Sequence, residues 1–415
     1  MSALAAALLA LSGVPLFVLI SALALLGFHQ GGIDLQVVFI EMYRLASTPA
    51  LTAIPLFAFT GFLLAESQAP RRLVHLSEVL LGWLPGGLAI MAVVVCSLLT
   101  ALTGASGMTI VALGGLLYPA LRAQRYSETF SLGLLTTCGS LGLLFPPSLP
   151  LIIYGIVSQT SIDQLFRAGL LPGALLVAVL ALYCFAVGRR HHVRRPRPSA
   201  AEVGVVCRSC ALELLLPLVM FGGIFSGVIA PSEAAALGVF YVLVVEVVVH
   251  REIPLRRLPG IIRDTLVLVG GILIVLAAAL AYTNYLVDAE VPVRLLGFIQ
   301  EHIHSRLAFL LVLNLFLLVV GCMLDIFSAL VVVVPLILPI AEAYGVHPVH
   351  LGIIFLTNLE LGYSTPPVGL NLFIASLRFG KPLTLLTRAS LPFLLLLLLC
   401  LILITYLPGL SLGLL

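Results

Sequence analysis

The 415-residue chain is far more apolar than a soluble domain. Hydrophobic residues make up 61% and charged residues 9%, with a net charge of +3, against roughly 45–50% and about 25% in soluble proteins. These values exclude an ordinary soluble enzyme, and the small net charge gives no indication of nucleic-acid binding. Charge-free windows such as 4–26 and 391–410 match the ~20 residues of a bilayer span. We therefore expect an all-α polytopic membrane protein.

Apolar segments and arginine clusters predict the order and direction of the spans. The first segment lacks a basic start and is too long for a signal peptide, so we expect a retained helix. Arginine-rich loops lie on the cytoplasmic side, which places the N-terminus in the cytoplasm and the C-terminus in the periplasm. Glu66 and Glu246, near span ends, are expected to snorkel to the interface. The apolar segments are 4–28, 49–66, 88–120, 129–157, 168–187, 211–229, 232–250, 265–287, 307–340, 349–378 and 389–411.

The segment 88–120 is predicted to be a re-entrant hairpin. Arg72 and Arg122 flank it, and both are expected in the cytoplasm, so the chain between them has to turn back. Two limbs of roughly 15 residues rise only about 22 Å, short of the ~30 Å hydrocarbon core. The small and hydroxyl residues 103–107 are the expected tip, and the amphipathic stretch 71–83 before the hairpin is expected to lie in the interface as an arm helix.

The chain contains an internal repeat. At a separation of 220 residues, Pro119 corresponds to Pro339, and Pro146-Pro147 to Pro366-Pro367. Arg122 and Arg125 follow the first copy of the lone proline, whereas Glu342, His347 and His350 follow the second. Because these loops carry opposite charge signals, we expect two inverted-topology repeats, each with a re-entrant helical hairpin and a broken transmembrane helix, as in many secondary transporters.

The double prolines are predicted to open both broken helices. Each proline lacks an N–H and clashes with the preceding turn, and opened backbone at bilayer depth is tolerated only inside protein or along a wet cavity. The exposed carbonyls suit a small cation, and the N-terminal ends of the following half-helices suit an anion. Hydroxyls of Thr103, Ser106 and Thr365 supply further oxygens. This pattern indicates cation-coupled uptake of an anionic solute.

These motifs together resemble a known family, the large membrane (DctM-like) subunit of tripartite ATP-independent periplasmic (TRAP) transporters. The resemblance covers essentially the whole chain and rests on ALTGASGMTIVALGGLLYPAL at 101–121, SLGLLFPPSLPLIIYG at 140–155, APSEAAALG at 230–238, GCMLD at 321–325 and NLELGYSTPPVGLNLF at 358–373. It implies a sodium-driven elevator in the bacterial inner membrane that imports a small organic anion. It also implies two partners, a small four-helix membrane subunit and a periplasmic substrate-binding protein. No organic cofactor is implied; sodium ions are the coupling ions.

The resemblance also implies two sodium sites. The first uses Thr103 and Ser106 with backbone of Gly142, Phe145 and Pro147. The second uses Gly321, Gly362, Thr365 and Pro367.

Four further polar residues lie at or near the second hairpin and the second break. Asp325, at the second hairpin tip, is a candidate either for coupling or for capping the following helix. Glu360, where many family members have a small apolar residue, is a candidate for coupling a proton or altering ion choice, because intramembrane carboxylates are functional candidates by default. Asn358 and Asn371 flank the break and are expected either to bind substrate or to tie the loose backbone.

Three alternatives to this function stay open. One is a stand-alone sodium/dicarboxylate symporter or sodium/proton antiporter of similar inverted-hairpin design. The others are a passive channel and an intramembrane enzyme, although the latter would need a paired nucleophile and base, and the sequence has no H-E-x-x-H motif. The predicted division of the chain is 1–87 scaffold helices and cytoplasmic arm helix, 88–187 first hairpin, broken helix and following span, 188–210 basic cytoplasmic loop, 211–306 scaffold helices and external arm helix, 307–378 second hairpin and broken helix, and 379–415 C-terminal span.

Overall fold

A computed structural model describes residues 14–46, 48–189 and 199–415, and all regular elements in these ranges are helical. The start of the first predicted span, 4–13, and residues 190–198 of the basic loop lie outside the described residues. Six helices are long and apolar enough to cross a membrane within the described ranges, and two bent helix pairs raise this number to as many as eight. The expected all-α polytopic fold is confirmed.

The N-terminal helices lead to a surface helix that enters the first hairpin. The helix α5 matches the predicted amphipathic stretch: it buries Leu73 and Leu76 and leaves Arg71 exposed. Proline at its second position, Pro70, suits a helix start because the missing N–H has no partner to lose there. The elements are α2 (Leu16–Gln30), α3 (Gln36–Ala46), a short 3₁₀ helix η1 (Pro49–Thr52), α4 (Ala53–Glu66) and α5 (Ala69–Leu81).

The first repeat begins with the predicted hairpin. Its limbs have 17 and 18 residues and rise about 26–27 Å, somewhat longer than expected. The chain turns at Gly104, whose φ of 65° favours glycine, and at the extended Ala105. The elements are α6 (Gly87–Thr103), α7 (Ser106–Ala123), α8 (Glu128–Cys138), the 3₁₀ turn η2 (Leu141–Leu144), α9 (Leu149–Ser158) and α10 (Ile162–Gly188).

The middle of the chain supplies further outer helices and α15, which precedes the second hairpin as α5 precedes the first. The helix α13 continues without a break into a π-helical turn, η3, and such turns occur frequently at functional sites. The elements are α11 (Ala200–Ser209), α12 (Ala211–Phe225), α13 (Pro231–Leu243), η3 (Val244–Val249), α14 (Leu258–Asp288) and α15 (Val291–His302).

The second repeat has the same order of elements as the first. The helix α17 begins at 326 and ends at 343, and α7 begins at 106 and ends at 123, so both ends are separated by 220 residues. This agreement confirms the internal repeat found in the sequence. The elements are α16 (Arg306–Met323), α17 (Ile326–Ala343), α18 (Pro348–Gly362), α19 (Leu370–Phe379), α20 (Leu383–Tyr406) and the short α21 (Gly409–Leu412).

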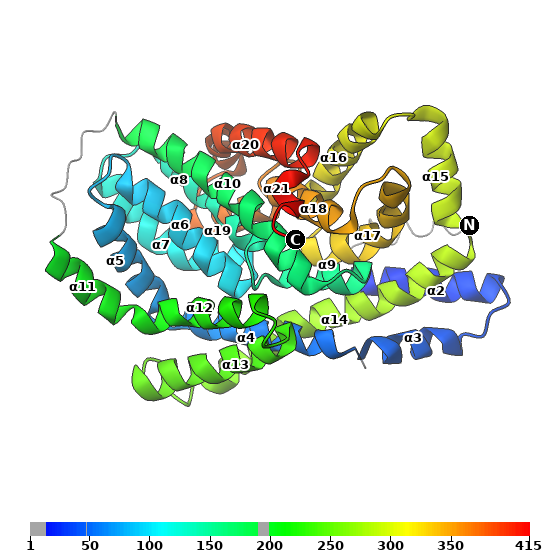
Figure 1. Ribbon diagram of the computed structural model, residues 1–415, viewed down its shortest axis with the longest axis horizontal. Coiled ribbons are helices and arrows are strands. Elements are labelled where there is room, and N and C mark those ends of the chain that lie inside the picture. The colour runs from blue at the N-terminus through cyan, green and yellow to red at the C-terminus, as the bar shows by residue number, and fades with distance from the viewer. Residues whose placement is uncertain (1–13, 47, 190–198) are drawn as a thin grey trace.

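The two repeats have opposite directions and interlock. The helices α5 and α15, which lead into the two hairpins, lie at opposite ends of the molecule (Figure 1). Each hairpin therefore enters from its own end, as an inverted repeat requires. The helix α19 packs on α7, and its counterpart α9 packs on α17. Likewise, α20 packs on α8 and α10 packs on α18, so each repeat covers the other.

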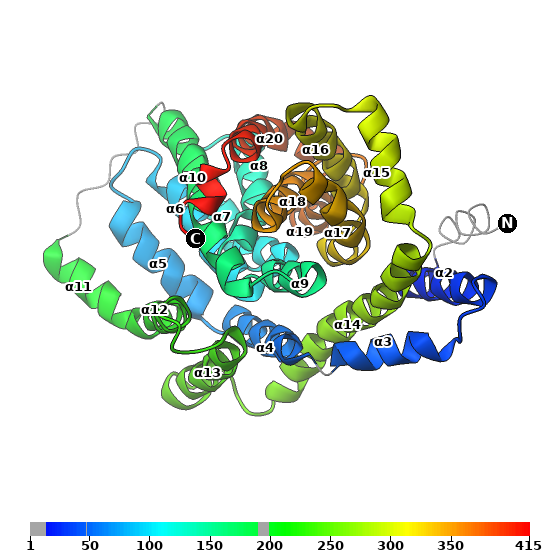
Figure 2. The ribbon, with the colours of Figure 1, turned by 45° about the vertical axis from the view of Figure 1, so that its right-hand side comes forward.

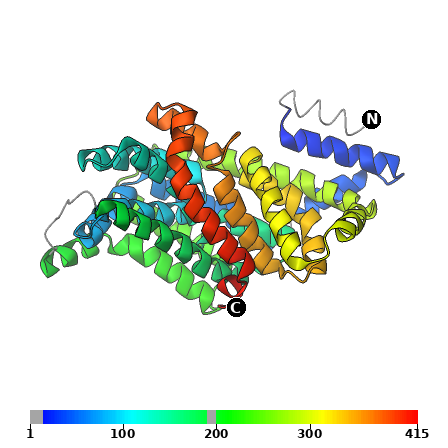
Figure 3. The same cartoon turned by 90° about the horizontal axis from the view of Figure 1, so that it is seen from above.

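The helices form an inner group and an outer rim. Figure 2 shows α6–α10 and α16–α20 gathered together, with α2, α3, α4, α13 and α14 along one side. The helix α14 joins the rim by packing on α2, α3 and α4, and it touches the inner group at α17. Figure 3 shows α20, drawn in red, crossing the inner group toward the C-terminus.

The expectation for Glu246 is wrong. Its side chain does not reach toward the interface; it is 1% exposed and pairs with Arg72 of α5 at 3.1 Å. The carboxylate is paired with the guanidinium of Arg72, 174 residues away in sequence, instead of being solvated by water at the interface.

Candidate functional site

The first broken helix opens before its prolines. The helix α8 ends at Cys138, η2 follows, Phe145 is extended, and α9 resumes at an angle of 45° to the first part. Pro146 has no N–H to donate to the carbonyl of Gly142 four residues earlier. The Phe145 N–H donates to that carbonyl instead, at 3.0 Å, which gives a tighter turn than an α-helix.

The second broken helix repeats this arrangement. The helix α18 ends at Gly362, and the Thr365 N–H donates to the Gly362 carbonyl at 3.0 Å, as Phe145 does to Gly142. The chain then turns through 363–369 before α19 begins. Both predicted breaks are therefore confirmed, at equivalent positions of the two repeats.

The breaks leave main-chain oxygens available. In the part of the chain that the structure describes, no backbone N–H donates to the carbonyls of Phe145, Pro147, Thr365 or Pro367. These four carbonyls belong to the predicted sodium-ligand sets. The first pair lies in a largely buried break, whereas Pro367 in the second break is exposed. Carbonyl oxygens of this kind can coordinate a small cation.

The tip of the first hairpin touches both broken helices. Gly142 lies directly against α6, since a Cβ there would be 2.2 Å from the Ser97 carbonyl oxygen. Thr103, at the end of α6, is fully buried. The Ser106 hydroxyl donates to Asn371 Oδ1 of α19 at 2.8 Å, and both side chains are buried. The first predicted set is thus brought near the break of its own repeat and is also tied to the second.

The second predicted set meets where α16 crosses α18. A Cβ on Gly362 would lie 2.5 Å from the Gly321 carbonyl carbon, so the two backbones are in direct contact. The Gly369 N–H donates to the Cys322 carbonyl at 3.1 Å, and Thr365 Oγ1 donates to the Leu361 carbonyl at 2.8 Å. The structure therefore brings Gly321 against Gly362, and Thr365 lies in the turn that follows Gly362.

Asp325 and Asn358 have structural contacts. Asp325 is exposed and caps α17, since its Oδ2 accepts from the N–H groups of Phe327 and Ser328 at 3.1 and 3.0 Å. Asn358 is buried and donates to Asn314 Oδ1 of α16 at 2.7 Å, and Asn314 in turn donates to Thr405 of α20 at 3.1 Å. Asn358 thus helps to join α18, α16 and α20. Asn371 faces the first hairpin tip, and its backbone N–H donates to the Tyr363 carbonyl at 2.9 Å, which joins the start of α19 to the end of the second break.

Glu360 is buried without a partner. Its side chain is 1% exposed, and neither carboxyl oxygen has a hydrogen bond to any residue that the structure describes. The carboxyl group lies near Cys138 at the end of α8 and near Cys400 of α20, on the side of α18 that faces the first repeat. An isolated ionised carboxylate in such a place is very costly, so this residue needs an ion or a proton nearby.

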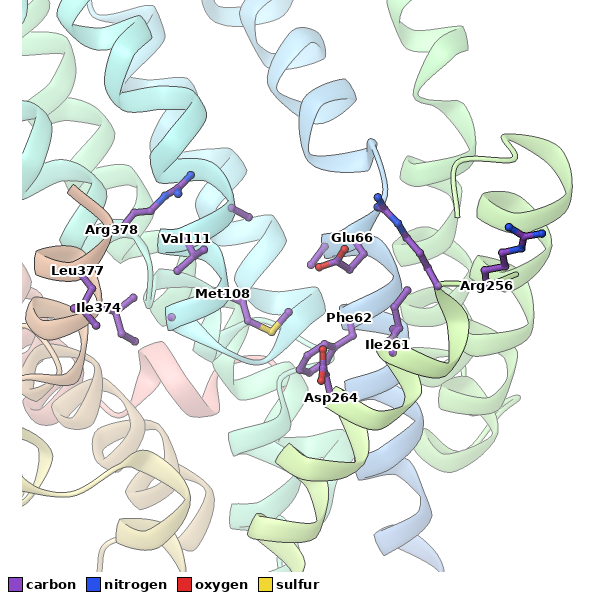
Figure 4. Close-up of a pocket in the computed structure, with 15 residues that line it drawn as sticks. Phe62, Glu66, Met108, Val111, Arg256, Ile261, Asp264, Ile374, Leu377 and Arg378 are labelled. Carbon is purple, nitrogen blue, oxygen red and sulfur yellow. The ribbon is translucent and has the colours of Figure 1, made fainter. Parts of the chain in front are cut away.

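A cavity of about 940 Å³ lies between the rim and the inner group, and its lining includes Gly107, the neighbour of Ser106 in the first hairpin tip. Figure 4 shows Met108 and Val111 of α7 with Ile374 and Arg378 of α19 on one wall, facing Phe62 and Glu66 of α4 and Ile261 and Asp264 of α14 on the other. Arg256 and Arg257, in the turn before α14, also line it. One wall of the cavity thus belongs to the inner group and the other to the rim. Its lining carries positive side chains (Arg256, Arg257 and Arg378) and negative ones (Glu66 and Asp264).

The sequence analysis did not single out Arg378. A Cβ on Gly115 of α7 would lie 1.8 Å from the Arg378 guanidinium, so the missing side chain leaves room for the arginine against α7. An available signal was Arg378 as the first Arg or Lys after the second break, at the end of a long segment poor in charge. Asn314 and Thr405 were also not identified, because single polar residues in apolar helices carry no distinctive spacing.

Comparisons with known proteins agree with one another. The family model of the tripartite ATP-independent periplasmic transporter, DctM component, matches residues 2–410. The C4-dicarboxylate TRAP transporter large permease protein DctM of Pseudomonas aeruginosa is 35% identical over 90% of this chain and 88% of its own length. The sialic acid TRAP transporter large permease protein SiaM of Vibrio cholerae is 31% identical over 87% and 85%. These relatives are named as transporter permeases, not enzymes.

Two further proteins extend the comparison. The isethionate TRAP transporter permease protein DctMQ of Oleidesulfovibrio alaskensis is 32% identical over 97% of this chain, which spans 64% of that longer protein. The YdaH transporter of Alcanivorax borkumensis, known from a crystal structure, has a TM-score of 0.62 over 95% of this chain and 98% of its own, at 15% identity, and shows the likeness of fold alone. The match along nearly the whole chain and the paired broken helices lead to one conclusion: the chain belongs to the tripartite ATP-independent periplasmic transporter family, as a large permease component of the DctM type.

Proposed function

We propose that this permease is the sodium-coupled membrane subunit of an importer for a small organic anion. In this proposal it acts with a small four-helix membrane subunit and a periplasmic substrate-binding protein, as the family's tripartite name suggests. The observation that carries the sodium coupling is the pair of matching breaks, at which four predicted ligand carbonyls accept no backbone hydrogen bond.

The proposed sodium sites use the residues that surround these breaks. Thr103 and Ser106 of the first hairpin tip, with the Gly142, Phe145 and Pro147 carbonyls, form the first set. Gly321, Gly362, Thr365 and Pro367 form the second. The inward sodium gradient would supply the driving force, and an ion held at each site would offset the carbonyl dipoles. The protein's part is to hold the oxygens in place, and the contact between Gly321 and Gly362 does this for the second set.

The cavity supports an anionic solute. Arg378, Arg256 and Arg257 line it, and guanidinium groups bind carboxylates in a bidentate geometry. Its relatives include C4-dicarboxylate and sialic acid permeases. We propose that the solute of this chain is likewise a small organic acid and that Arg378, on the wall formed by the inner group, is its counter-charge.

The walls of the cavity support an elevator motion in the inner membrane. One wall belongs to α7 and α19, which interlock with the rest of the inner group, and the other to α4 and α14, which belong to the rim. Arg256 and Arg257 lie in a loop that the positive-inside rule assigns to the cytoplasm. We propose that the described conformation opens toward that side, with the N-terminus cytoplasmic and the C-terminus periplasmic.

The test is uptake in proteoliposomes that contain both membrane subunits and the binding protein, with Thr365→Ala compared with Thr357→Ala. Both threonine hydroxyls donate to the carbonyl four residues earlier, at 2.8 and 2.7 Å, so each variant loses the same kind of side-chain hydrogen bond. We expect Thr365→Ala alone to raise the sodium concentration needed for half-maximal uptake, by roughly tenfold or more. Equal sodium dependence in both variants would count against the second site. Uptake by this chain without partners would favour a stand-alone symporter.

A further inference from the structure

A second charged cluster lies away from the breaks, where the arm helix meets the rim. Arg72 of α5 donates to three carboxylates, to Glu213 of α12 at 2.5 Å, to Glu246 of η3 at 3.1 Å and to Glu252 in the turn that follows. The Gln68 N–H also donates to Glu252, at 2.7 Å. Transport through the broken helices makes no use of this cluster.

The charges of the cluster do not balance. Burial raises the pKa of Glu252, but the Gln68 N–H and the Arg72 guanidinium outweigh this effect and hold the pKa below its ordinary value. The side chains of Glu213 and Glu246 are only 3% and 1% exposed. Three carboxylates against one guanidinium leave two negative charges in a largely dry place, which is costly unless another cation is present.

His250 faces the two buried carboxylates at distances that are too long for hydrogen bonds. Its Nδ1 lies 3.8 Å from Glu213 Oε1 and 3.6 Å from Glu246 Oε2, beyond the usual 2.7–3.2 Å. In the described structure Nδ1 has no hydrogen-bond partner, and neither has Glu213 Oε2, although the Glu213 side chain is almost fully buried. His250 Nδ1 and Glu213 Oε2 are therefore available to a ligand, whereas Glu213 Oε1 and both Glu246 oxygens already accept from Arg72.

The spacing of the three side chains fits one metal ion. Ligand atoms of Glu213, Glu246 and His250 lie within 4.8 Å of one another. Nitrogen and oxygen ligands at about 2.1 Å from a tetrahedral Zn²⁺ ion are about 3.4 Å apart, close to the distances from His250. Imidazole with carboxylates is a ligand set that suits divalent transition metals.

The π-helical turn helps to form this group. The His250 N–H donates to the carbonyl of Val245 at 2.7 Å, five residues earlier, and the Glu252 N–H donates to the Glu246 carbonyl at 2.9 Å. This wide turn presents Glu246 and His250 on the same side and folds Glu252 back toward Arg72.

We propose that Glu213, Glu246 and His250 bind one divalent transition-metal ion of the Zn²⁺ class. Arg72 hydrogen-bonds both ligand carboxylates from outside and Glu252 completes the shell, as outer partners do in metal sites. A charge of +2 offsets the two negative charges that remain. The ion would fix α12 and the end of α13 in the arrangement that holds α5, the helix leading into the first hairpin. This inference is independent of sodium coupling.

The experiment uses the full chain, purified with its membrane partner where that is required for stability, stripped with chelator and titrated with Zn²⁺ or Co²⁺. We expect one ion per chain, a higher unfolding temperature with Zn²⁺, and Co²⁺ absorption bands of a nitrogen and oxygen ligand set. His250→Gln replaces the imidazole with an uncharged polar side chain of similar size, and we expect it to weaken binding by about a hundredfold or more. His302→Ala, an exposed histidine on α15, should bind like the unmodified chain.

Two results would overturn the metal site. One is the absence of stoichiometric uptake by the unmodified chain, or equal uptake by His250→Gln. The other is an unfolding temperature that changes with pH between about 5 and 8 and is the same with and without Zn²⁺, since protons would then balance the cluster. The unfolding transition distinguishes loss of the site from loss of fold, because a His250→Gln chain that is folded but lacks the site shows its ordinary transition without the Co²⁺ bands.

Discussion

Ser106 and Asn371 form the contact that joins the first hairpin tip to the second broken helix. The residues are 265 apart in sequence, and the hydroxyl donates to the amide oxygen at 2.8 Å in a buried place. The same serine is a predicted sodium ligand. Because its proton points to Asn371, the oxygen lone pairs stay available to a cation. One bond can thus link ion binding to the packing between the repeats.

Ser106→Ala tests this link. We expect a loss of about 0.5–1.5 kcal/mol in the free energy of unfolding, since the Asn371 amide oxygen loses its buried partner, together with weaker sodium activation of uptake. Thermal unfolding and proteoliposome uptake are the measurements. The control is Ser226→Ala, whose exposed hydroxyl bonds only to the Gly223 carbonyl. A Ser106→Ala protein with unchanged stability and sodium dependence would contradict the proposed link.

Glu360 gives a second prediction at the residue scale. Its carboxyl group is buried without a partner among the described residues, and an ionised carboxylate there is costly without a cation nearby. We therefore propose that Glu360 is ionised only while sodium is bound and is protonated otherwise. We expect Glu360→Gln to raise the sodium concentration for half-maximal uptake by about three- to tenfold. Glu342→Gln, at the exposed end of α17, is the control. If the two variants have the same sodium dependence, Glu360 only fills space.

At the scale of elements, the close contact between α16 and α18 holds the second break. Gly321 and Gly362 let the two backbones meet without side chains between them. In the first repeat, Gly142 similarly lies against the α6 backbone, where a Cβ would be 2.4 Å from the Ala101 nitrogen. In each repeat a hairpin limb thus rests directly on a broken helix, so movement of one limb has to shift the carbonyls of the opening.

Gly362→Ala should separate α16 from α18. The added Cβ would meet the Gly321 backbone at 2.5–2.6 Å, and backbone cannot move aside as a flexible side chain does. We expect a loss of about 1–3 kcal/mol in unfolding free energy, measured by thermal or denaturant unfolding in detergent. Gly270→Ala on α14 has open space around the new atom and should be neutral or stabilising by up to about 1 kcal/mol. Equal effects at both positions would show that the contact between the helices is not tight.

At the scale of the whole molecule, the cavity divides two groups of helices that the elevator proposal requires to move past each other. Val111 and Ile261 line opposite walls, on α7 and α14, whereas Val111 and Ile374 lie on the same wall. If α7 and α14 move relative to each other during transport, a covalent cross-link between them has to stop transport.

Cross-linking tests this motion. In a background without the seven native cysteines, we expect Val111→Cys with Ile261→Cys, joined by a reducible linker of fitting length, to lose uptake and to recover it on reduction. Val111→Cys with Ile374→Cys should keep uptake after the same treatment. Full transport with the opposite walls joined would rule out relative movement of these helices.

The sequence alone predicted the features that depend on the chemistry of residues at that point of the chain. Pro146-Pro147 and Pro366-Pro367 predicted both breaks because proline removes a helical donor at the residue where it stands, and the residues around Gly104 predicted the first tip. The 220-residue repeat followed from the same prolines. The ligand roles of these residues stay predictions.

Pairings between distant residues had no such signal. Nothing in the sequence indicated that Arg72 would reach Glu246, or that Ser106 would meet Asn371, because each pair is joined only by tertiary packing. The limbs of the first hairpin are also longer than the sequence predicts, because the apolar run ends at residue 120 whereas α7 continues to Ala123. A helix can continue through polar residues at its end, such as Arg122 in α7, and a hydropathy pattern does not include these residues in the span.

The central claim is that opened backbone in two inverted repeats couples solute entry to sodium. The most direct measurement is uptake of a candidate organic acid by the complete three-protein system in proteoliposomes, with sodium gradient, proton gradient and membrane potential imposed separately. The account predicts accumulation only with an inward sodium gradient, and collapse of uptake when that gradient is dissipated. Equal accumulation without sodium, driven by protons or by the solute gradient alone, would contradict it.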